Sequence, residues 1–353
     1  MGFQKELINY KTQIDSILKE YLEKEREKAS SIAPSNVKIL DFIINFCLRG
    51  GKRIRPILFI KGYEVVGGGN LSKIIQASIC MELLEAYLLI HDDIIDQDMV
   101  RRGGPSFHQM NLEWKGEVIP RDAHFGISSA IIAGDMLSSL GDKVIMETNF
   151  REDLKIRVLK EFTNAKLNCF HGELYDVILE KQNEVCEGDF LKMIDLKTAS
   201  YTTQAPLVMG AICGEATNIQ IETLREYGKL LGEAFQIIDD ILGTFGDERT
   251  TGKPVDSDIK QGKKTLLLIY ALEHTEKGDK NFLKKVWGDK DLTKNNLSKI
   301  KDILTNTGSV AYSQNKAQEL SARAKIILNH GNFSPEPKNF LNLLSDFIVE
   351  RKL

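Results

Sequence analysis

The sequence predicts an all-α protein, and three observations indicate it. Apolar residues recur with helical spacing along most of the chain, short turn-forming breaks separate these stretches, and no convincing series of alternating strands is found. The chain has 353 residues, 42% of them hydrophobic, which is enough for a large core. We therefore expect one large bundle of about a dozen helices around a central cavity.

The first helix is predicted over residues 4–29, where the apolar residues share one helical face and Lys and Glu occupy the rest. These residues are Leu7, Ile14, Ile17, Leu18, Tyr21 and Leu22. The same periodicity predicts helices over 37–48, 53–66, 72–98, 121–149, 151–180, 189–213, 219–245, 263–275, 294–306, 309–329 and 336–351. The central helices carry few charges, so we expect them to form the core.

Glycine and proline clusters mark the breaks, for example at 50–51, 67–70, 103–105, 246–254 and 334–335. None of them is long or biased enough to be an interdomain linker, and no repeat of 20–50 residues is evident. We therefore expect a single domain over residues 1–353.

Composition excludes several classes of protein. The chain has 47 Lys and Arg against 50 Asp and Glu, which argues against a generally nucleic-acid-binding surface. Its five cysteines form no CxxC pair, so neither a zinc site nor a disulfide framework is indicated, and a cytoplasmic location is expected. The N-terminus shows no signal segment, and no apolar run approaches the roughly 18 residues that span a bilayer.

A first acidic cluster, His91-Asp92-Asp93-Ile94-Ile95-Asp96-Gln97-Asp98, closes an otherwise apolar helix. Asp92 and Asp96 are four residues apart, so their carboxylates lie on one face, one turn apart. Like charges at this spacing repel each other and favour a bound cation, and oxygen-only ligation suits magnesium. The alternative is a solvated acidic helix end.

A second acidic pair lies in Phe235-Gln236-Ile237-Ile238-Asp239-Asp240-Ile241-Leu242-Gly243. Gln236, Asp239 and Asp240 share a helical face within apolar surroundings. A lone pair of this kind is typical of a helix end, but two such pairs inside apolar helices favour a metal site between facing helices.

Basic residues are equally concentrated. Arg49-Gly50-Gly51-Lys52-Arg53-Ile54-Arg55-Pro56 holds four cations in eight residues, and residues 42–63 contain no Asp or Glu. Glycine lets a backbone approach a ligand closely, so this segment is a credible anion cradle, although no P-loop motif is present. Further basic sites are Arg101-Arg102, Lys197, Lys253 and Lys263-Lys264. Together the clusters indicate a site for a diphosphate attached to an apolar group.

The motifs resemble those of the trans-isoprenyl diphosphate synthases, the polyprenyl synthase family. GGKRIRP, HDDIID followed by RRG, KTASY, FQIIDDILG, GKP and DIKQGKKT occur in that family's order and approximate spacing over about residues 45–270. The resemblance implies the isoprenoid synthase type of helical bundle, head-to-tail (1'-4) prenyl transfer, a homodimer, and magnesium with three ions per site.

The resemblance also implies roles for individual residues. An allylic diphosphate is expected to bind through magnesium to Asp92, Asp96 and Asp239, with Asp93 and Asp240 in support. The residues that match the family's allylic-diphosphate contacts are Arg101, Lys197, Thr198, Gln236 and Lys253, and Lys263 is expected to join them. Lys52, Arg55 and Arg102 match the residues that hold isopentenyl diphosphate. Among these, Asp92, Asp96, Lys197, Thr198, Gln236 and Asp239 are the expected catalytic residues.

Two positions depart from the family pattern. Gly243 stands where many members have a third aspartate, and Glu85 stands where members usually place His or Gln near isopentenyl diphosphate. A carboxylate at residue 85 would repel a diphosphate unless it is protonated or bridged by a metal or water, so Glu85 is not among the expected site residues.

Tyr87, five residues before Asp92, is expected to set product length. An aromatic residue at this position resembles the geranylgeranyl type, so a twenty-carbon product is favoured over farnesyl diphosphate or a longer chain. The alternative for Tyr87 is an ordinary core aromatic.

Four other functions compete with this hypothesis. A terpene cyclase also uses DDxxD, but its second metal motif differs and it needs no second diphosphate cradle. An HD phosphohydrolase requires a histidine before His91, and the sequence has none there. A non-catalytic synthase subunit would be expected to lack some of the aspartates, and a structural bundle would not explain paired charges in apolar helices.

Overall fold

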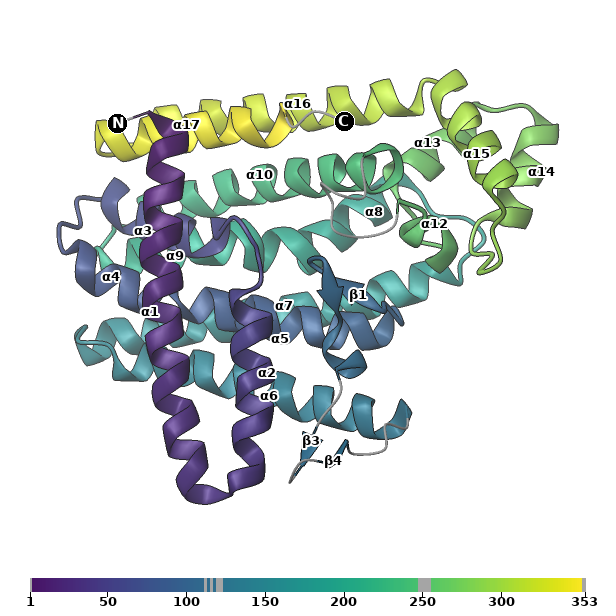
Figure 1. Ribbon diagram of the computed structural model, residues 1–353. Helices are drawn as coiled ribbons and strands as arrows, with labels where there is room; N and C mark the ends of the chain where they lie inside the picture. Colours follow the sequence, from purple (N-terminus) through teal and green to yellow (C-terminus); the bar gives the residue numbers. More distant parts are fainter. Residues whose placement is uncertain (1, 111–112, 115–116, 119–122, 247–254, 351–353) are drawn as a thin grey trace.

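The structure, a computed structural model, describes residues 2–110, 113–114, 117–118, 123–246 and 255–350. It confirms the predicted all-α class (Figure 1). In chain order the helices are α1 (Phe3–Ile32), α2 (Pro34–Leu48), α3 (Ile54–Val65), α4 (Leu71–Ser78), α5 (Cys80–Ile95), α6 (Ala123–Glu147), α7 (Glu152–Glu180), α8 (Glu187–Ile194), α9 (Ala205–Cys213), α10 (Asn218–Phe245), α12 (Ser257–Gln261), α13 (Leu266–His274), α14 (Lys277–Val286), α15 (Lys294–Asn306), α16 (Ser309–His330) and α17 (Pro335–Val349).

Shorter elements connect some of these helices. A π-helical segment, η2 (Asp195–Gln204), joins α8 to α9, and a 3-10 turn, η1 (Phe107–Gln109), precedes α6. Two antiparallel hairpins, β1 (Val100–Arg101) with β2 (Gly104–Pro105) and β3 (Glu113–Trp114) with β4 (Glu117–Val118), lie between α5 and α6.

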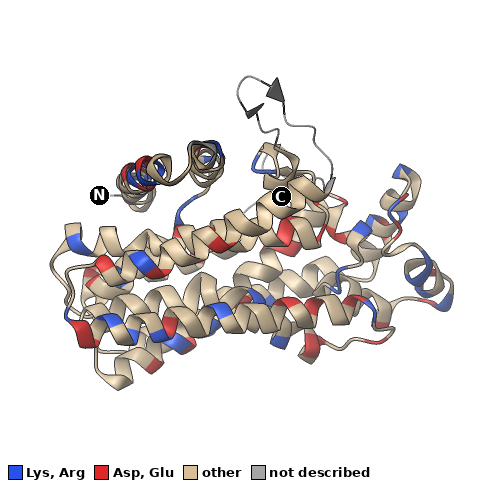
Figure 2. Cartoon of the chain, turned by 90° about the horizontal axis from the view of Figure 1, so that it is seen from below, with Lys and Arg blue, Asp and Glu red and all other residues tan. Residues whose placement is uncertain are grey.

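The long helices form stacked layers with an N-terminal helical hairpin at one side. α16 packs on α10, α10 on η2, and η2 on α7, while α5 packs on α6 (Figure 1). The α1–α2 hairpin runs across these layers, so Figure 2 shows it nearly end-on beside them. Every residue of α9 is buried, as expected for a central helix that carries no charge.

Most predicted helices are found, with differences that have local causes. The predicted helix 72–98 is divided at Ile79, which keeps a right-handed helical backbone, and it ends at Ile95, two residues before Gln97 with φ of 59°. The predicted helix 189–213 contains η2, because apolar periodicity does not distinguish a π-helical turn from an α-helical one. The sequence analysis missed α14, where Leu283 and Val286 are buried among mostly polar residues.

The sequence analysis underestimated the length of one apolar stretch. Residues Leu71–Ile95 are long and apolar enough to cross a membrane by length and composition, contrary to the expectation from the sequence. In the structure 72% of the apolar window is buried inside the protein, as in a core helix.

Candidate functional site

A cavity of about 1160 Å³ lies between α3, α5, α7, η2, α10 and α12. It is lined by the predicted catalytic, substrate-binding, metal-binding and product-length residues in the described part of the chain, namely Lys52, Arg55, Tyr87, Asp92, Asp96, Arg101, Arg102, Lys197, Thr198, Gln236, Asp239 and Lys263. Of the two supporting aspartates, Asp240 lines the cavity, whereas Asp93 is buried and does not. The remaining predicted residue, Lys253, lies outside the described residues. Segments more than two hundred residues apart in sequence, such as those of Lys52 and Lys263, therefore share one cavity.

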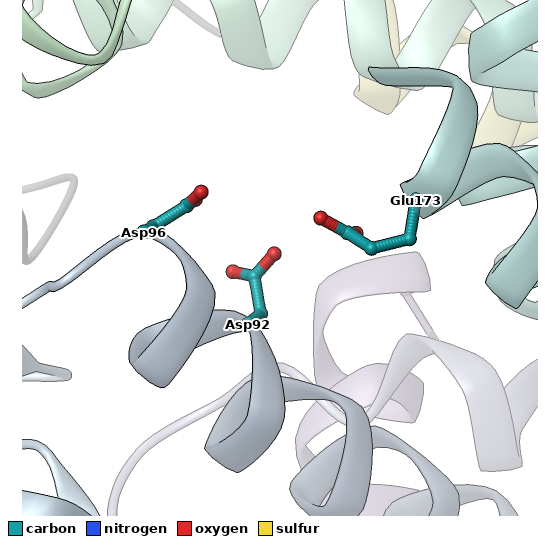
Figure 3. Close-up of side chains that lie close together, drawn as sticks. All are labelled: Asp92, Asp96 and Glu173. Atoms are coloured by element: carbon teal, nitrogen blue, oxygen red, sulfur yellow. The ribbon is translucent and has the colours of Figure 1, made fainter. Parts of the chain in front are cut away.

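Three carboxylates converge at one wall of the cavity (Figure 3). Asp92 and Asp96 lie at the C-terminal end of α5, and Glu173 faces them from α7, with one oxygen of each within 4.8 Å of the others. Burial, together with repulsion by Asp92, raises the pKa of Asp96 to about 7. A divalent cation bound here would relieve this repulsion, and the all-oxygen donor set suits magnesium.

Two lysines lie close to these carboxylates and are held by Asp176. The Lys197 ammonium is 2.7 Å from the Asp176 carboxylate and 2.9 Å from Glu173, and the Lys263 ammonium is 3.1 Å from Asp176 and 2.9 Å from Asp96. Burial opposes the ionisation of Asp176, but the two ammonium groups outweigh it and lower the pKa of its carboxyl. Asp176 thus holds both ammonium groups beside the wall formed by Asp92, Asp96 and Glu173.

Gly172 allows η2 to pack closely against α7, which places Lys197 beside the carboxylates of α7. A Cβ atom at residue 172 would lie 2.2 Å from the backbone nitrogen of Lys197. Only glycine at this point of α7 allows the two segments to touch, because a side chain would meet backbone rather than a flexible group.

The second acidic motif faces the cavity from α10. The Thr198 hydroxyl donates to the Gln236 amide oxygen at 2.8 Å, and the Gln236 amide nitrogen donates to Asp240 at 2.7 Å. Burial and the neighbouring Asp258 raise the pKa of Asp240. Asp239, one residue earlier, lines the cavity.

Gly243, the first departure from the family pattern, lies next to the side chain of Asp258. A Cβ atom here would lie 2.9 Å from the carboxylate of Asp258, which lines the cavity from α12. The glycine therefore leaves room for Asp258, and the region beside a missing third aspartate still contains a carboxylate.

Arg101 is held among the aspartates of the first motif. Its guanidinium donates to Asp93 at 2.6 Å through Nε, and it contacts Asp92 at 3.3 Å and Asp98 at 3.2 Å. The side chain is buried, and its aspartate partners keep the pKa of Arg101 raised although burial opposes the charge.

The cations of the basic cradle predicted from the sequence do not all face the cavity. Lys52, Arg55 and Arg102 line the cavity. Arg53 does not line it, because its side chain is only 2% exposed and pairs with Asp15 at 2.6 Å and with Glu82. Arg53 therefore fastens α1 and α5 to the cradle segment instead of facing a ligand.

Comparisons with known proteins now identify the family. A family model described as polyprenyl synthetase matches residues 37–304, which is more than half of the chain. The chain belongs to this family. It is a trans-prenyltransferase, so the resemblance and the activity class predicted from the sequence are confirmed.

Curated relatives of this polyprenyl synthetase differ in their named products. Geranylfarnesyl diphosphate synthase of Aeropyrum pernix is 33% identical over 86% of this chain and 91% of its own. Geranylgeranyl diphosphate synthase of Sulfolobus acidocaldarius is 32% identical over 86% of this chain and 88% of its own.

Solved structures agree with the fold. Geranylgeranyl pyrophosphate synthase from Corynebacterium glutamicum, complexed with isoprenyl diphosphate and magnesium, has a TM-score of 0.89 at 27% identity and covers 97% of this chain and 99% of its own. The enzyme from Pyrococcus horikoshii has a TM-score of 0.83 at 30% identity over the whole of both chains.

Tyr87 lies where the polyprenyl synthetase cavity meets the core. Its ring makes edge contacts with His91 at 4.8 Å and Phe170 at 6.1 Å between ring centroids. Leu83 and Leu84, one turn earlier on α5, are fully buried and do not line the cavity. Of these three residues of α5, only Tyr87 therefore reaches the cavity.

Glu173 and Asp176 were missed by the sequence analysis. They stand in α7 with Glu180 at a spacing of i, i+3 and i+7, which places all three on one helical face. This spacing was the available signal, but α7 carries many other charges, so the stripe is not distinguishable from a solvated face.

Proposed function

We propose that this prenyltransferase condenses isopentenyl diphosphate with allylic diphosphates, head to tail, and that its main product is geranylgeranyl diphosphate. The single observation that carries the proposal is the shared cavity. It brings Asp92, Asp96 and Asp239 together with Lys52, Arg55 and Arg102, and its apolar lining includes Tyr87 and Phe170. Such a cavity suits two diphosphates and one growing hydrocarbon chain.

We assign the allylic diphosphate to the acidic side. Asp92 and Asp96 on one helix and Asp239 on another would hold magnesium, and the proposal includes three ions per site. When bound, magnesium would neutralise the charge that develops on the departing diphosphate. The protein groups assigned to the same diphosphate are Arg101, Lys197, Thr198, Gln236, Lys253 and Lys263.

Glu173 joins this assignment as a further metal-facing carboxylate. Its oxygen lies within 4.8 Å of those of Asp92 and Asp96, and burial raises the pKa of Glu173 despite the nearby Lys197. A cation at this wall would therefore have carboxylates on two sides.

We assign isopentenyl diphosphate to Lys52, Arg55 and Arg102. The Arg55 guanidinium lies 4.7 Å from the centre of the Tyr201 ring and donates to the Tyr201 hydroxyl at 3.1 Å, which fixes its orientation. The same nitrogen, Nη2, also donates to the Thr202 hydroxyl at 3.0 Å, so the guanidinium can offer a phosphate its positive charge and the donor Nη1, which now pairs with Glu85.

The chemistry follows from this placement. The allylic C1–O bond breaks, the electrons remain on the diphosphate, and the cationic side chains stabilise that charge. The double bond of isopentenyl diphosphate then forms the new carbon–carbon bond at C1, and the released diphosphate accepts the proton lost. Apolar walls, including Phe170 and Leu174, exclude water that would otherwise capture the cation.

The twenty-carbon product rests on Tyr87. Its ring lies against Phe170 at the apolar end of the cavity, with the buried leucines of α5 beyond it. The named products of the relatives differ in length by one five-carbon unit. A single aromatic side chain that blocks further growth could account for a difference of that size.

We also propose a homodimer. α6 and α7 pack against each other and expose apolar side chains, with Ile132 60% and Leu174 60% exposed. The other exposed apolar residues on these helices include Ile131, Leu167, Phe170 and Ile178. A second copy would cover this stripe and close the side of the cavity formed by Phe170 and Leu174.

The remaining parts of the proposal concern organisation and location. Residues 1–353 form a single domain with the motif-bearing core over about 45–270. A cytoplasmic location is supported by the cysteines, since Cys47, Cys80, Cys169, Cys186 and Cys213 are all free thiols.

Incubation of the purified protein with labelled isopentenyl diphosphate, magnesium and each allylic starter tests the function. We expect a twenty-carbon diphosphate from dimethylallyl, geranyl and farnesyl starters. Failure to form any product from all three starters would refute the proposal, and a fifteen- or twenty-five-carbon main product would refute only the chain length.

A further inference from the structure

We propose that Glu85 is a built-in competitor of isopentenyl diphosphate, a carboxylate that occupies the diphosphate-binding arginines and sets the affinity of that subsite. This inference rests on the proposed function, because it concerns the subsite assigned above to isopentenyl diphosphate. The acid at residue 85, the second departure from the family pattern, would then determine the affinity for isopentenyl diphosphate.

The geometry places one oxygen of Glu85 between two guanidinium groups. Oε1 accepts from Arg102 at 2.6 Å and lies 2.9 Å from Nη1 of Arg55. Glu85 is only 9% exposed, and all three side chains line the cavity. The two arginines that would hold a diphosphate oxygen are thus already joined by a carboxylate oxygen.

The charge state of Glu85 supports this competition. Burial opposes its ionisation, but Arg55 and Arg102 outweigh burial, and the pKa of Glu85 is lowered. Glu82, one turn earlier, shows the contrast, because burial and the neighbouring Glu85 raise its pKa to about 7. Glu85 is therefore the more fully ionised member of this pair at neutral pH.

A diphosphate entering this subsite must exchange with Glu85 for the same donors. Buried charge-assisted hydrogen bonds are strong, and the tethered carboxylate is present at high effective concentration. Glutamine at residue 85 would keep the shape but lose the charge, and the formal charge of the group with Lys52, Arg55 and Arg102 would rise by one. The exchange would then cost less, and the subsite would bind diphosphates more tightly.

The competition also separates the two diphosphate subsites. Both substrates carry the same headgroup, so a purely cationic subsite would accept an allylic diphosphate as well as isopentenyl diphosphate. Glu85 weakens this subsite for every diphosphate and leaves the metal-binding side, with Asp92 and Asp96, as the preferred place for the allylic one. Its loss should make excess allylic diphosphate more inhibitory.

The test compares wild type, Glu85→Gln and a matched control, Glu82→Gln. Glu82 is on the same helix and is also paired with an arginine, but it does not line the cavity. Calorimetry with inorganic diphosphate in the presence of a chelator measures the anion subsite without turnover. Steady-state assays then give the KM values of both substrates, and circular dichroism verifies that each variant is folded.

We expect Glu85→Gln to bind inorganic diphosphate about tenfold more tightly, with a similar fall in the KM of isopentenyl diphosphate and little change in that of the allylic substrate. Allylic inhibition should appear at lower concentration. Unchanged or weaker binding would overturn the inference and make Glu85 a residue that positions the arginines. Equal tightening in folded Glu82→Gln would also overturn it, and if that control does not fold, Glu161→Gln, from the Arg225 pair outside the cavity, replaces it.

Failure of the inference is distinguishable from failure of the proposed function. Active wild type without tighter binding in Glu85→Gln refutes the inference alone. Tighter binding in that variant, combined with no prenyl product from wild type, refutes the function while the anion subsite stands.

Discussion

Replacing Tyr87 by alanine is expected to lengthen the product by one five-carbon unit. In α5 the next residues on the same face towards the N-terminus are Leu84 and Leu83, three and four positions earlier. At about 1.5 Å per residue, they lie roughly 4.5 and 6 Å further along the helix axis. That depth is comparable with one isoprene unit, so Tyr87→Ala should convert a twenty-carbon product into a twenty-five-carbon one.

The neighbours of Tyr87 define the controls. Tyr87→Phe keeps the ring that contacts Phe170 and His91, so its product should not change. Phe170 stays as the facing wall in Tyr87→Ala, and the double variant with Phe170→Ala should extend the distribution further. Chain lengths are read by chromatography after removal of the diphosphate, with farnesyl diphosphate as the starter and isopentenyl diphosphate in excess.

An unchanged product from a folded and active Tyr87→Ala enzyme would refute the reasoning. It would show that the hydrocarbon does not end at this ring, and Tyr87 would then be a core aromatic at the edge of the cavity. Circular dichroism separates this result from unfolding, which matters because the Tyr87 side chain is only 8% exposed.

Three further predictions concern metal, pH and assembly. The double change Asp92→Asn and Asp96→Asn should lower magnesium-dependent turnover by more than about a hundredfold, and calorimetry with manganese that shows unaltered binding would contradict the metal assignment. Burial raises the pKa of Glu233 to about 7, so wild-type stability should be lost as pH rises from about 4.5 through 7. Glu233→Gln should therefore gain about 3 kcal/mol of unfolding free energy relative to wild type at pH 8 but under about 1 kcal/mol at pH 5, and equal effects in urea melts at both pH values would refute this. Leu174→Glu with Ile178→Glu should convert the proposed dimer into a monomer, as measured by sedimentation, and an unchanged mass would contradict an interface at α7.

Helical periodicity predicted those parts of the site that depend on one helix. Asp92 and Asp96 share a face because they are four residues apart, and the same spacing lets Gln236 donate to Asp240 at 2.7 Å. Periodicity also predicted most helices, because their apolar faces are buried in the bundle. These relations are local, so sequence alone contains them.

Relations between helices were less predictable. Glu173 and Asp176 look like residues of a solvated face until η2 packs across Gly172 and brings Lys197 to them. Arg53 lies in a cationic segment, but its backbone has φ of 57° and its side chain pairs with Glu82 inside the protein. The direction of a side chain in a loop depends on tertiary packing, which the residue spacing does not reveal.

Paired charges explain how so polar a cavity is compatible with a folded protein. A buried cation without a counter-ion would cost several kcal/mol, and Lys197 and Lys263 avoid this cost through the shared carboxylate of Asp176. The same pairing holds each cation in place before a substrate arrives, which lowers the reorganisation needed for catalysis. Because the cations are already paired, a diphosphate must compete with the protein's own carboxylates. It binds only where its interaction with the cations is more favourable than theirs. On the acidic side a bound metal can add to the attraction for the diphosphate. The subsite proposed at Arg55 and Arg102 includes no such metal, so the diphosphate has to displace Glu85 through its own negative charge. The two subsites should therefore differ in metal dependence, with allylic binding strengthened by magnesium and isopentenyl binding governed by residue 85.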